Sequence, residues 1–217
     1  MIKFNKIKKQ VILIVAIILL LLEGGVLLRT LLHNKGSEIN PEVSVQTELY
    51  SGKGIVYAWQ EGAGYIVTAG HILDGLSAQS PCAVVFSNGE KRTAEVIYRS
   101  DFADVAFLKV EGDEVPVVTM DRKSFDALSE GDTLYRLEAD EEKLVKVEGT
   151  LLSPWIYLED FALDMMLAKL ECGRGMSGCG IYDKNGYFVG ILCGISHEGE
   201  AAILPLSIIE SQWIMAN

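Results

Sequence analysis

Three segments of the sequence carry residue types that could together activate a nucleophile. His71 ends the segment 65–71 (YIVTAGH), Asp104 directly precedes a mostly apolar run, and Ser177 lies in the glycine-dense segment 173–180 (GRGMSGCG). A serine hydroxyl is a weak nucleophile until an imidazole takes its proton, and a buried carboxylate must hold that imidazole in one tautomer. The three segments therefore predict a catalytic triad of His71, Asp104 and Ser177.

The glycines around Ser177 predict a second feature, a site for a developing oxyanion. They allow the loop to turn sharply and to aim backbone N–H groups inward, and we expect the N–H groups of Gly175 and Ser177 to be these donors. Such donors stabilise the tetrahedral intermediate of acyl transfer. Cys179 could suggest a cysteine nucleophile instead. Because Ser177 already occupies the nucleophile position, a small residue packed beneath the loop is the better interpretation of Cys179.

Several titratable residues have simpler interpretations. Asp101 competes with Asp104 for the place of the triad carboxylate, but Asp101 could simply cap a turn, and Asp104 adjoins the apolar strand. His33 and His197 are interpreted as structural or solvated. No spacing of cysteine and histidine indicates a metal site, and we expect no metal and no cofactor.

Taken together, these motifs resemble the trypsin-like (chymotrypsin-fold) serine proteases, and within them the catalytic domain of the bacterial HtrA type. The order His, Asp, Ser along the chain is that of chymotrypsin. The resemblance covers roughly residues 52–209 and includes the segments 51–56 (SGKGIV) and 202–206 (AILPL). It implies an all-β fold of two packed antiparallel barrels with the active site in the cleft between them, and protein or peptide substrates.

Three features depart from the family pattern. The family usually has Gly-Gly-Pro or Gly-Ser-Pro after the serine, whereas this sequence has Gly178-Cys179-Gly180; residues 175–178, which would form the oxyanion site, are intact. HtrA proteases carry PDZ domains after the catalytic domain, and this sequence ends before one could start. Where glutamate-specific relatives place a histidine, this sequence has Leu192.

The same resemblance implies four residues that contact the substrate. Leu192 would give the primary specificity pocket an apolar wall, and Cys193 and Gly194 follow it on the same predicted strand. Glu171, six residues before Ser177, falls where trypsin-like relatives have the residue at the base of the pocket. Glu171 would favour basic substrate side chains there, but a solvated glutamate is the simpler interpretation.

The elements that would position these residues are short and rich in β-forming residues. Asn88-Gly89 and Asn185-Gly186 are typical of tight hairpins, and Ser207 with the run 208–215 predicts a capped C-terminal helix. Short strands separated by turns, without long helices between them, indicate an all-β barrel or sandwich. The predicted strands are 54–59, 65–68, 82–86, 93–99, 105–110, 133–137, 144–152, 165–170, 180–182, 187–195 and 201–204.

The N-terminal residues predict a single-pass anchor in the cell membrane. Residues 11–32 are almost wholly apolar, and about 20 such residues let a helix cross the hydrocarbon core. The lysines within residues 1–10 predict a cytoplasmic N-terminus, with the protease domain, 51–217, outside the cytoplasm. A cleaved signal peptide is the alternative, although no small-x-small cleavage site is visible. Residues 33–50 predict a polar linker.

Charge and cysteine content narrow the possible partners. Residues 1–40 hold six Lys/Arg against two Asp/Glu, and the rest of the chain holds 13 against 28. So acidic a domain does not attract nucleic acid electrostatically. Cys82, Cys172, Cys179 and Cys193 follow the predicted anchor and could form up to two disulfides. Three pairings are possible, and the sequence favours none of them.

The sequence therefore predicts a membrane-anchored serine endopeptidase that cleaves extracytoplasmic proteins through a Ser-His-Asp triad and an acyl-enzyme intermediate. The alternative is a pseudoprotease, a membrane-tethered module that keeps the fold and uses its cleft only to bind peptides. The complete triad favours the enzyme, whereas the departure at Cys179-Gly180 keeps the binding module open. The oligomeric state stays open as well.

Overall fold

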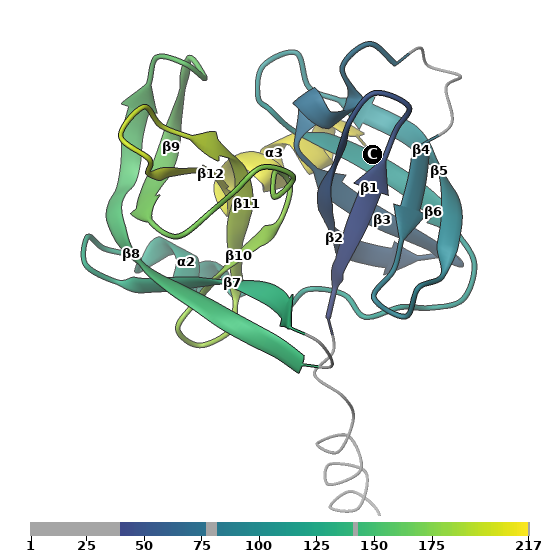
Figure 1. The fold of residues 1–217 in the computed structure, drawn as a ribbon, viewed down its shortest axis with the longest axis horizontal. Helices are drawn as coiled ribbons and strands as arrows, with labels where there is room; N and C mark the ends of the chain where they lie inside the picture. The colour runs from purple at the N-terminus through teal and green to yellow at the C-terminus, as the bar shows by residue number, and fades with distance from the viewer. Residues whose placement is uncertain (1–39, 77–81, 141–142, 217) are drawn as a thin grey trace, which may run out of the picture. The chain divides into compact units, whose positions relative to one another are not determined.

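The computed structural model describes residues 40–76, 82–140 and 143–216, and within them the strands form two closed six-stranded antiparallel barrels (Figure 1). The first barrel contains β1 (Glu42–Gln46), β2 (Ser51–Gln60), β3 (Ala63–Thr68), β4 (Cys82–Val85), β5 (Lys91–Arg99) and β6 (Ala106–Glu111). The second contains β7 (Thr133–Asp140), β8 (Lys143–Leu158), β9 (Leu163–Lys169), β10 (Gly180–Asp183), β11 (Phe188–Ile195) and β12 (Ala201–Pro205). The helical elements of the described residues are a 3-10 turn, η1 (Gly70–Leu73), and two helices, α2 (Arg122–Asp126) and α3 (Leu206–Ala216).

The order of the strands confirms the expected two-barrel fold. Around the first barrel the order is β1-β2-β3-β6-β5-β4, and around the second it is β10-β11-β12-β9-β8-β7. Each strand range expected from the sequence corresponds to one of the strands β2 to β12. The two Asn-Gly pairs lie in the turns between β4 and β5 and between β10 and β11.

The strand β1 is the exception, because it lies within residues 33–50, which the sequence pattern predicts to be a linker. β1 pairs with β2 on one side and with β4 on the other, and so closes the first barrel. Its inward side chains are those of Val43 and Val45, both buried. Two valines among polar neighbours are a weak strand signal, so the barrel begins earlier than residue 51.

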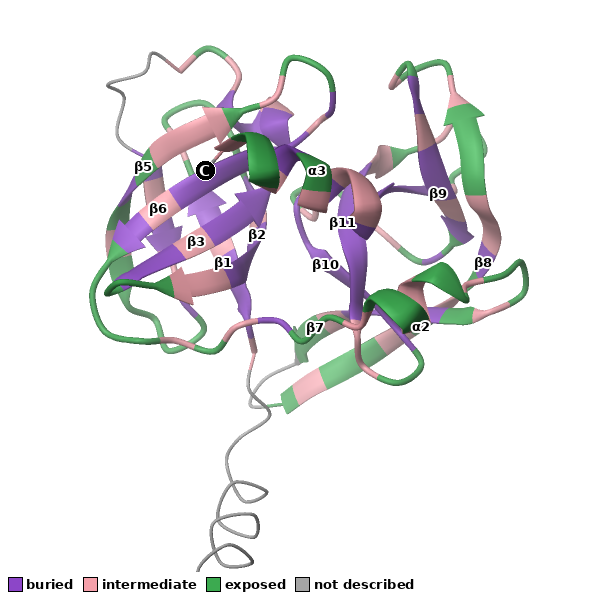
Figure 2. Cartoon of the chain, turned by 180° about the vertical axis from the view of Figure 1, so that it is seen from behind, coloured by how far each residue is buried: buried purple, intermediate pink, exposed green. Residues whose placement is uncertain are grey.

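The helix α3 connects the two barrels. It directly follows β12 of the second barrel, and its Trp213 ring lies 5.5 Å from Tyr57 and 4.9 Å from Phe107 of the first barrel, measured between ring centroids. The Tyr98 hydroxyl of the first barrel also donates a hydrogen bond to Gln212 at 2.8 Å. Figure 2 shows the helix from behind, with its outer surface exposed. The predicted C-terminal helix that packs back onto the barrel is confirmed.

Buried apolar side chains hold the two barrels together. One cluster includes Ile55, Ile66 and Phe107 of the first barrel together with Phe188 and Ile191 of the second. A second cluster fills the interior of the second barrel. Because the first cluster crosses from one barrel to the other, residues of the two barrels can be held in fixed positions at the boundary between them.

The predicted membrane span, 11–32, lies outside the described residues. Within residues 40–76, 82–140 and 143–216, no helix is long and apolar enough to cross a membrane.

Candidate active site

His71 and Asp104 meet because of the pairing of β3 with β6. Thr68 at the end of β3 pairs with Ala106 at the start of β6, so the segments that extend beyond this edge lie side by side. In η1, Nδ1 of His71 lies 2.8 Å from Oδ2 of Asp104. The backbone N–H of His71 donates to the other carboxylate oxygen, Oδ1, also at 2.8 Å. Both oxygens of Asp104 therefore fix the position of His71.

The pKa values of this pair are shifted in opposite directions. The hydrogen bond to Asp104 raises the pKa of His71 above its ordinary value of 6.5; Asp74 adds to the rise, whereas burial and Arg99 oppose it. Burial by itself would raise the pKa of Asp104, but the hydrogen bonds and charge of His71 outweigh it, and the pKa falls below 3.8. The pair thus stabilises an imidazolium beside a carboxylate, the state that a general base reaches after it takes a proton.

The loop that carries Asp104 is fixed from both barrels. The Ser100 hydroxyl accepts hydrogen bonds from the backbone N–H groups of Phe102 and Ala103, each at 3.0 Å. From the second barrel, the buried thiol of Cys193 donates to the backbone oxygen of Asp104 at 3.4 Å. Asp101 is exposed, and among the described residues the hydrogen bonds and ion pair of His71 with a carboxylate are to Asp104 and not to Asp101.

Ser177 lies in a loop that is held between β2 and β11. Its backbone oxygen accepts a hydrogen bond from Lys53 of β2 at 2.8 Å, and the N–H of Gly178 donates to Leu192 of β11 at 2.7 Å. Gly178 has a φ of +87°, and a Cβ atom there would lie 2.0 Å from the Lys53 carbonyl oxygen. Only glycine fits this close approach of the loop to the first barrel.

Two backbone donors beside Ser177 are free. Among the described residues, neither the N–H of Gly175 nor the N–H of Ser177 donates to a protein acceptor. The next two residues differ, because Gly178 and Cys179 both use their N–H groups in bonds within the protein. The two free donors are the pair that the sequence predicts for the oxyanion site, and they are available to a ligand oxygen.

The serine hydroxyl is not hydrogen-bonded to the histidine. In the part of the chain that the structure describes, no bond joins Oγ of Ser177 to Nε2 of His71. The His71 side chain is 42% exposed, so the imidazole ring can be reached from outside. In enzymes of this chemistry, such a bond is often loose without substrate and tightens when substrate binds.

The cysteines do not form the alternative nucleophile. Cys82, Cys172, Cys179 and Cys193 all have free thiols. Burial raises the pKa of Cys179 well above its ordinary value of 9.0, so the thiol stays protonated beneath the loop.

The four residues predicted to contact the substrate lie in different environments. Leu192 is 1% exposed and packs in the interior cluster of the second barrel, which Cys172 borders. Cys193 is buried beneath Asp104. A Cβ atom on Gly194 would lie 3.0 Å from the ring of Phe161. The side chain of the fourth residue, Glu171, is exposed.

Arg136 is a residue of this region that the sequence pattern does not single out. It is 3% exposed, and its Nε donates to the backbone oxygen of Glu171 at 2.7 Å. Its Nη1 lies 2.6 Å from the carboxylate of Glu138. The available signal is an arginine within an otherwise β-forming run, 133–137 (TLYRL), because an arginine in a buried strand requires partners.

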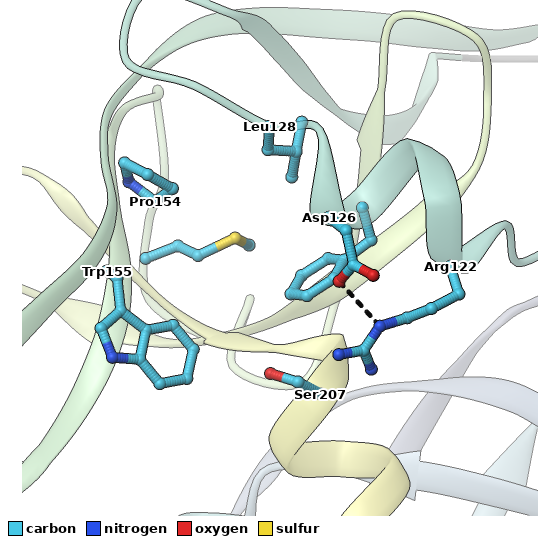
Figure 3. A pocket seen from close by; sticks show the side chains of 8 residues that line it. Arg122, Asp126, Leu128, Pro154, Trp155 and Ser207 are labelled. Atoms are coloured by element: carbon cyan, nitrogen blue, oxygen red, sulfur yellow. Dashed lines mark hydrogen bonds and ion pairs between the residues drawn. The ribbon is translucent and has the colours of Figure 1, made fainter.

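A separate pocket of about 330 Å³ lies between α2, the hairpin of β8 and β9, and the start of α3 (Figure 3). Arg122 and Asp126 on its wall form an ion pair at 2.8 Å, and Trp155 faces them across the pocket. None of the three candidate triad residues lines it. The chemistry described above therefore lies elsewhere on the molecule.

Two closed antiparallel barrels, with a histidine–aspartate pair on one and a glycine-rich serine loop on the other, define the chymotrypsin-fold class. The sequence matches the family described as "Trypsin-like peptidase domain" over residues 52–191, a range that contains His71, Asp104 and Ser177. The chain belongs to this family.

Individual relatives point to the HtrA type. A serine protease Do-like HtrA of Lactobacillus helveticus is 28% identical over 110 residues, which cover 50% of this chain and 26% of that protein. The chain thus matches about a quarter of the length of this curated relative. The resemblance to the HtrA type is confirmed.

Solved structures share the fold. The HtrA-type protease AlgW with a tripeptide aligns with a TM-score of 0.70 at 19% identity, covering 82% of this chain and 61% of AlgW. The inactive form of a serine-to-alanine mutant of Rv3671c from M. tuberculosis aligns with a TM-score of 0.65 at 15% identity, covering 81% of this chain and 86% of that one.

Proposed function

We propose that this chain is a membrane-anchored serine endopeptidase that hydrolyses peptide bonds of extracytoplasmic proteins. The observation that carries the proposal is the contact of 2.8 Å between Nδ1 of His71 and Asp104, at the edge of the barrel against which the loop of Ser177 is held. In this arrangement His71 acts as the general base, Asp104 as its orienting carboxylate and Ser177 as the nucleophile.

The proposed reaction has two halves. Oγ of Ser177 attacks the carbonyl carbon of the substrate while Nε2 of His71 takes the hydroxyl proton, and the resulting oxyanion accepts hydrogen bonds from the N–H groups of Gly175 and Ser177. The intermediate collapses to an acyl-enzyme, and His71 gives its proton to the leaving amine. A water molecule, activated by His71 in the same way, then hydrolyses the ester and restores the serine.

The proposed specificity is for small or medium apolar side chains before the cleaved bond. The half-buried Cys172 supplies apolar surface next to Glu171, and the interior cluster that contains Leu192 packs against it; the buried guanidinium of Arg136 donates to the backbone oxygen of Glu171. A basic substrate side chain would lose its hydration there, and the carboxylate of Glu138 is already paired with Arg136. The carboxylate of Glu171 is the rival determinant, because it would attract Lys or Arg.

Cleavage of a proteome-derived peptide library tests activity and specificity together. We expect the wild-type chain to cut after apolar residues, with differences of about 1–3 kcal/mol per methylene between aliphatic side chains, and Glu171→Gln to leave this profile unchanged. A dominant Lys/Arg profile that disappears in Glu171→Gln would show that the pocket recognises the positive charge of the substrate side chain through Glu171. A library left uncut would contradict the proposed endopeptidase.

The proposed location follows from the sequence of residues 1–32, with basic residues before an apolar span. We expect protease added outside intact cells to digest the domain and to spare a tag on the N-terminus, because the lysines keep that end cytoplasmic. Lysed cells provide the control, in which the tag is digested as well. A domain that is digested only after lysis would show the opposite orientation, with the domain inside the cell.

A pseudoprotease that binds peptides is the second candidate function. It is favoured by the sequence Gly178-Cys179-Gly180 after the serine, which departs from the Gly-Gly-Pro or Gly-Ser-Pro usual in the family. A binding module would hold peptides without cleaving them, so the library experiment and the labelling of Ser177 described below separate the two functions.

A further inference from the structure

The loop that presents the candidate oxyanion donor Gly175 is a four-residue turn closed by Met176. The backbone N–H of Met176 donates to the backbone oxygen of Gly173 at 3.3 Å. In the opposite direction, the backbone N–H of Gly173 donates to the thioether sulfur, Sδ, of Met176 at 3.1 Å. The two residues therefore form a reciprocal pair of hydrogen bonds around Arg174 and Gly175.

Packing does not hold the exposed part of this turn. Gly173, Arg174 and Gly175 are exposed, and a Cβ atom built on either glycine would meet no described atom within 4 Å. Gly175 also has a φ of +81°, in the left-handed region that glycine adopts without steric cost. Among the described residues, the side-chain hydrogen bond on this turn is the one that the sulfur of Met176 accepts from Gly173.

Met176 is itself fixed at its other end. It is half-buried and packs against the interior cluster of the second barrel. Its backbone oxygen accepts a hydrogen bond from the N–H of Cys179 at 2.9 Å. The sulfur is therefore held from the interior side, and it can transmit that restraint to the exposed turn.

We infer that Met176 is a positioning residue for the oxyanion site, in which its thioether accepts the N–H of Gly173 and so orients the N–H of Gly175. This inference rests on the proposed function. A thioether is a weak acceptor, so its bond supports the turn modestly. The contribution appears when charge develops on the substrate oxygen, because a donor that is free to rotate away stabilises that charge less well.

Two substitutions separate the sulfur as an acceptor from the sulfur as packing. Met176→Leu keeps the apolar volume but places a methyl group at the δ position, where it cannot accept a hydrogen bond. Met176→Asn loses the packing but places an acceptor oxygen, Oδ1, the same number of bonds from the backbone. If only the packing of Met176 mattered, Met176→Leu would lower the activity less than Met176→Asn. If the hydrogen bond accepted by the sulfur matters, Met176→Asn lowers the activity less.

The test uses the purified full-length chain, a fluorophosphonate probe and a peptide that the wild type cleaves. For Met176→Leu we expect kcat and the second-order rate of labelling to fall about fivefold to tenfold with KM unchanged, and amide hydrogen exchange in residues 171–176 to quicken. Met176→Asn is expected to restore part of the rate and of the exchange protection.

Any of the following results would contradict the inference. Wild-type rates in Met176→Leu, or rates in Met176→Asn no higher than in Met176→Leu, would overturn it while leaving the proposed function intact. A wild-type chain that neither labels nor cleaves would overturn the proposed function, and this inference with it.

Discussion

Replacing Ser177 with alanine is expected to lower kcat for peptide hydrolysis by about a million-fold, to the level supported by binding and the oxyanion site alone. The reason is chemical, since the hydroxyl is the atom proposed to form the acyl bond. The substitution removes one oxygen from a half-exposed side chain, so the melting temperature should stay close to that of the wild type. Hydrolysis rates and thermal unfolding of the two proteins check both statements.

Ser211→Ala is a matched control for this substitution. Ser211 is exposed on α3, where its hydroxyl donates to the backbone oxygen of Ile208 at 2.7 Å, and its loss should leave hydrolysis unchanged. Hydrolysis that persists at the wild-type rate in Ser177→Ala would show that Ser177 is not the nucleophile.

Replacing Asp104 with asparagine is expected to lower kcat by about 10⁴-fold, as loss of the orienting carboxylate does in triads of this kind. Asparagine keeps the shape but cannot accept both N–H groups of His71 as a carboxylate does. The neutral amide also removes the hydrogen bond and charge that raise the pKa of His71 above 6.5.

The same substitution is expected to shift the pH dependence of kcat/KM in a definite direction. The proposed reaction requires neutral His71, so kcat/KM of the wild type should fall as the pH drops through the raised pKa of His71 in the free enzyme, above 6.5. In Asp104→Asn the acidic limb should move to lower pH. Asp101→Asn, an exposed carboxylate in the same loop, is the control and should leave rate and profile unchanged. An acidic limb that does not move in Asp104→Asn would contradict the pairing.

Much of the fold could be predicted from sequence because short strands carry a local signal. Short runs of β-forming residues between turns locate β2 to β12, and the Asn-Gly pairs mark two of the hairpins. β1 has only Val43 and Val45 facing inward, and it becomes a strand because β2 and β4 both pair with it. That stabilisation is tertiary, so no local pattern reports it.

The residues of the candidate site also differ in whether a local sequence pattern predicts them. His71, Asp104 and Ser177 could be singled out because each stands in a distinctive segment. The residues that surround them could not, because their partners are distant in sequence. Cys193 contacts the loop of Asp104 from the other barrel, and Arg136 bonds the backbone 35 residues further along the chain.

The role inferred for Met176 could not be predicted from its side-chain type. Methionine usually fills apolar space, and Met176 does pack against the interior cluster of the second barrel. Its bond from the N–H of Gly173 depends on the conformation of a four-residue turn. Side-chain type alone does not predict that a thioether is used as an acceptor.

The most direct test of the central claim is labelling of the purified full-length chain with a fluorophosphonate, followed by mass-spectrometric location of the adduct. A serine activated by His71 displaces fluoride and retains the phosphonyl group, whereas an ordinary serine hydroxyl does not react. We expect one adduct per chain, on Oγ of Ser177, which is absent from the Ser177→Ala and His71→Ala variants. A folded wild-type chain that stays unlabelled, or that carries its adduct on another residue, would contradict the proposed triad.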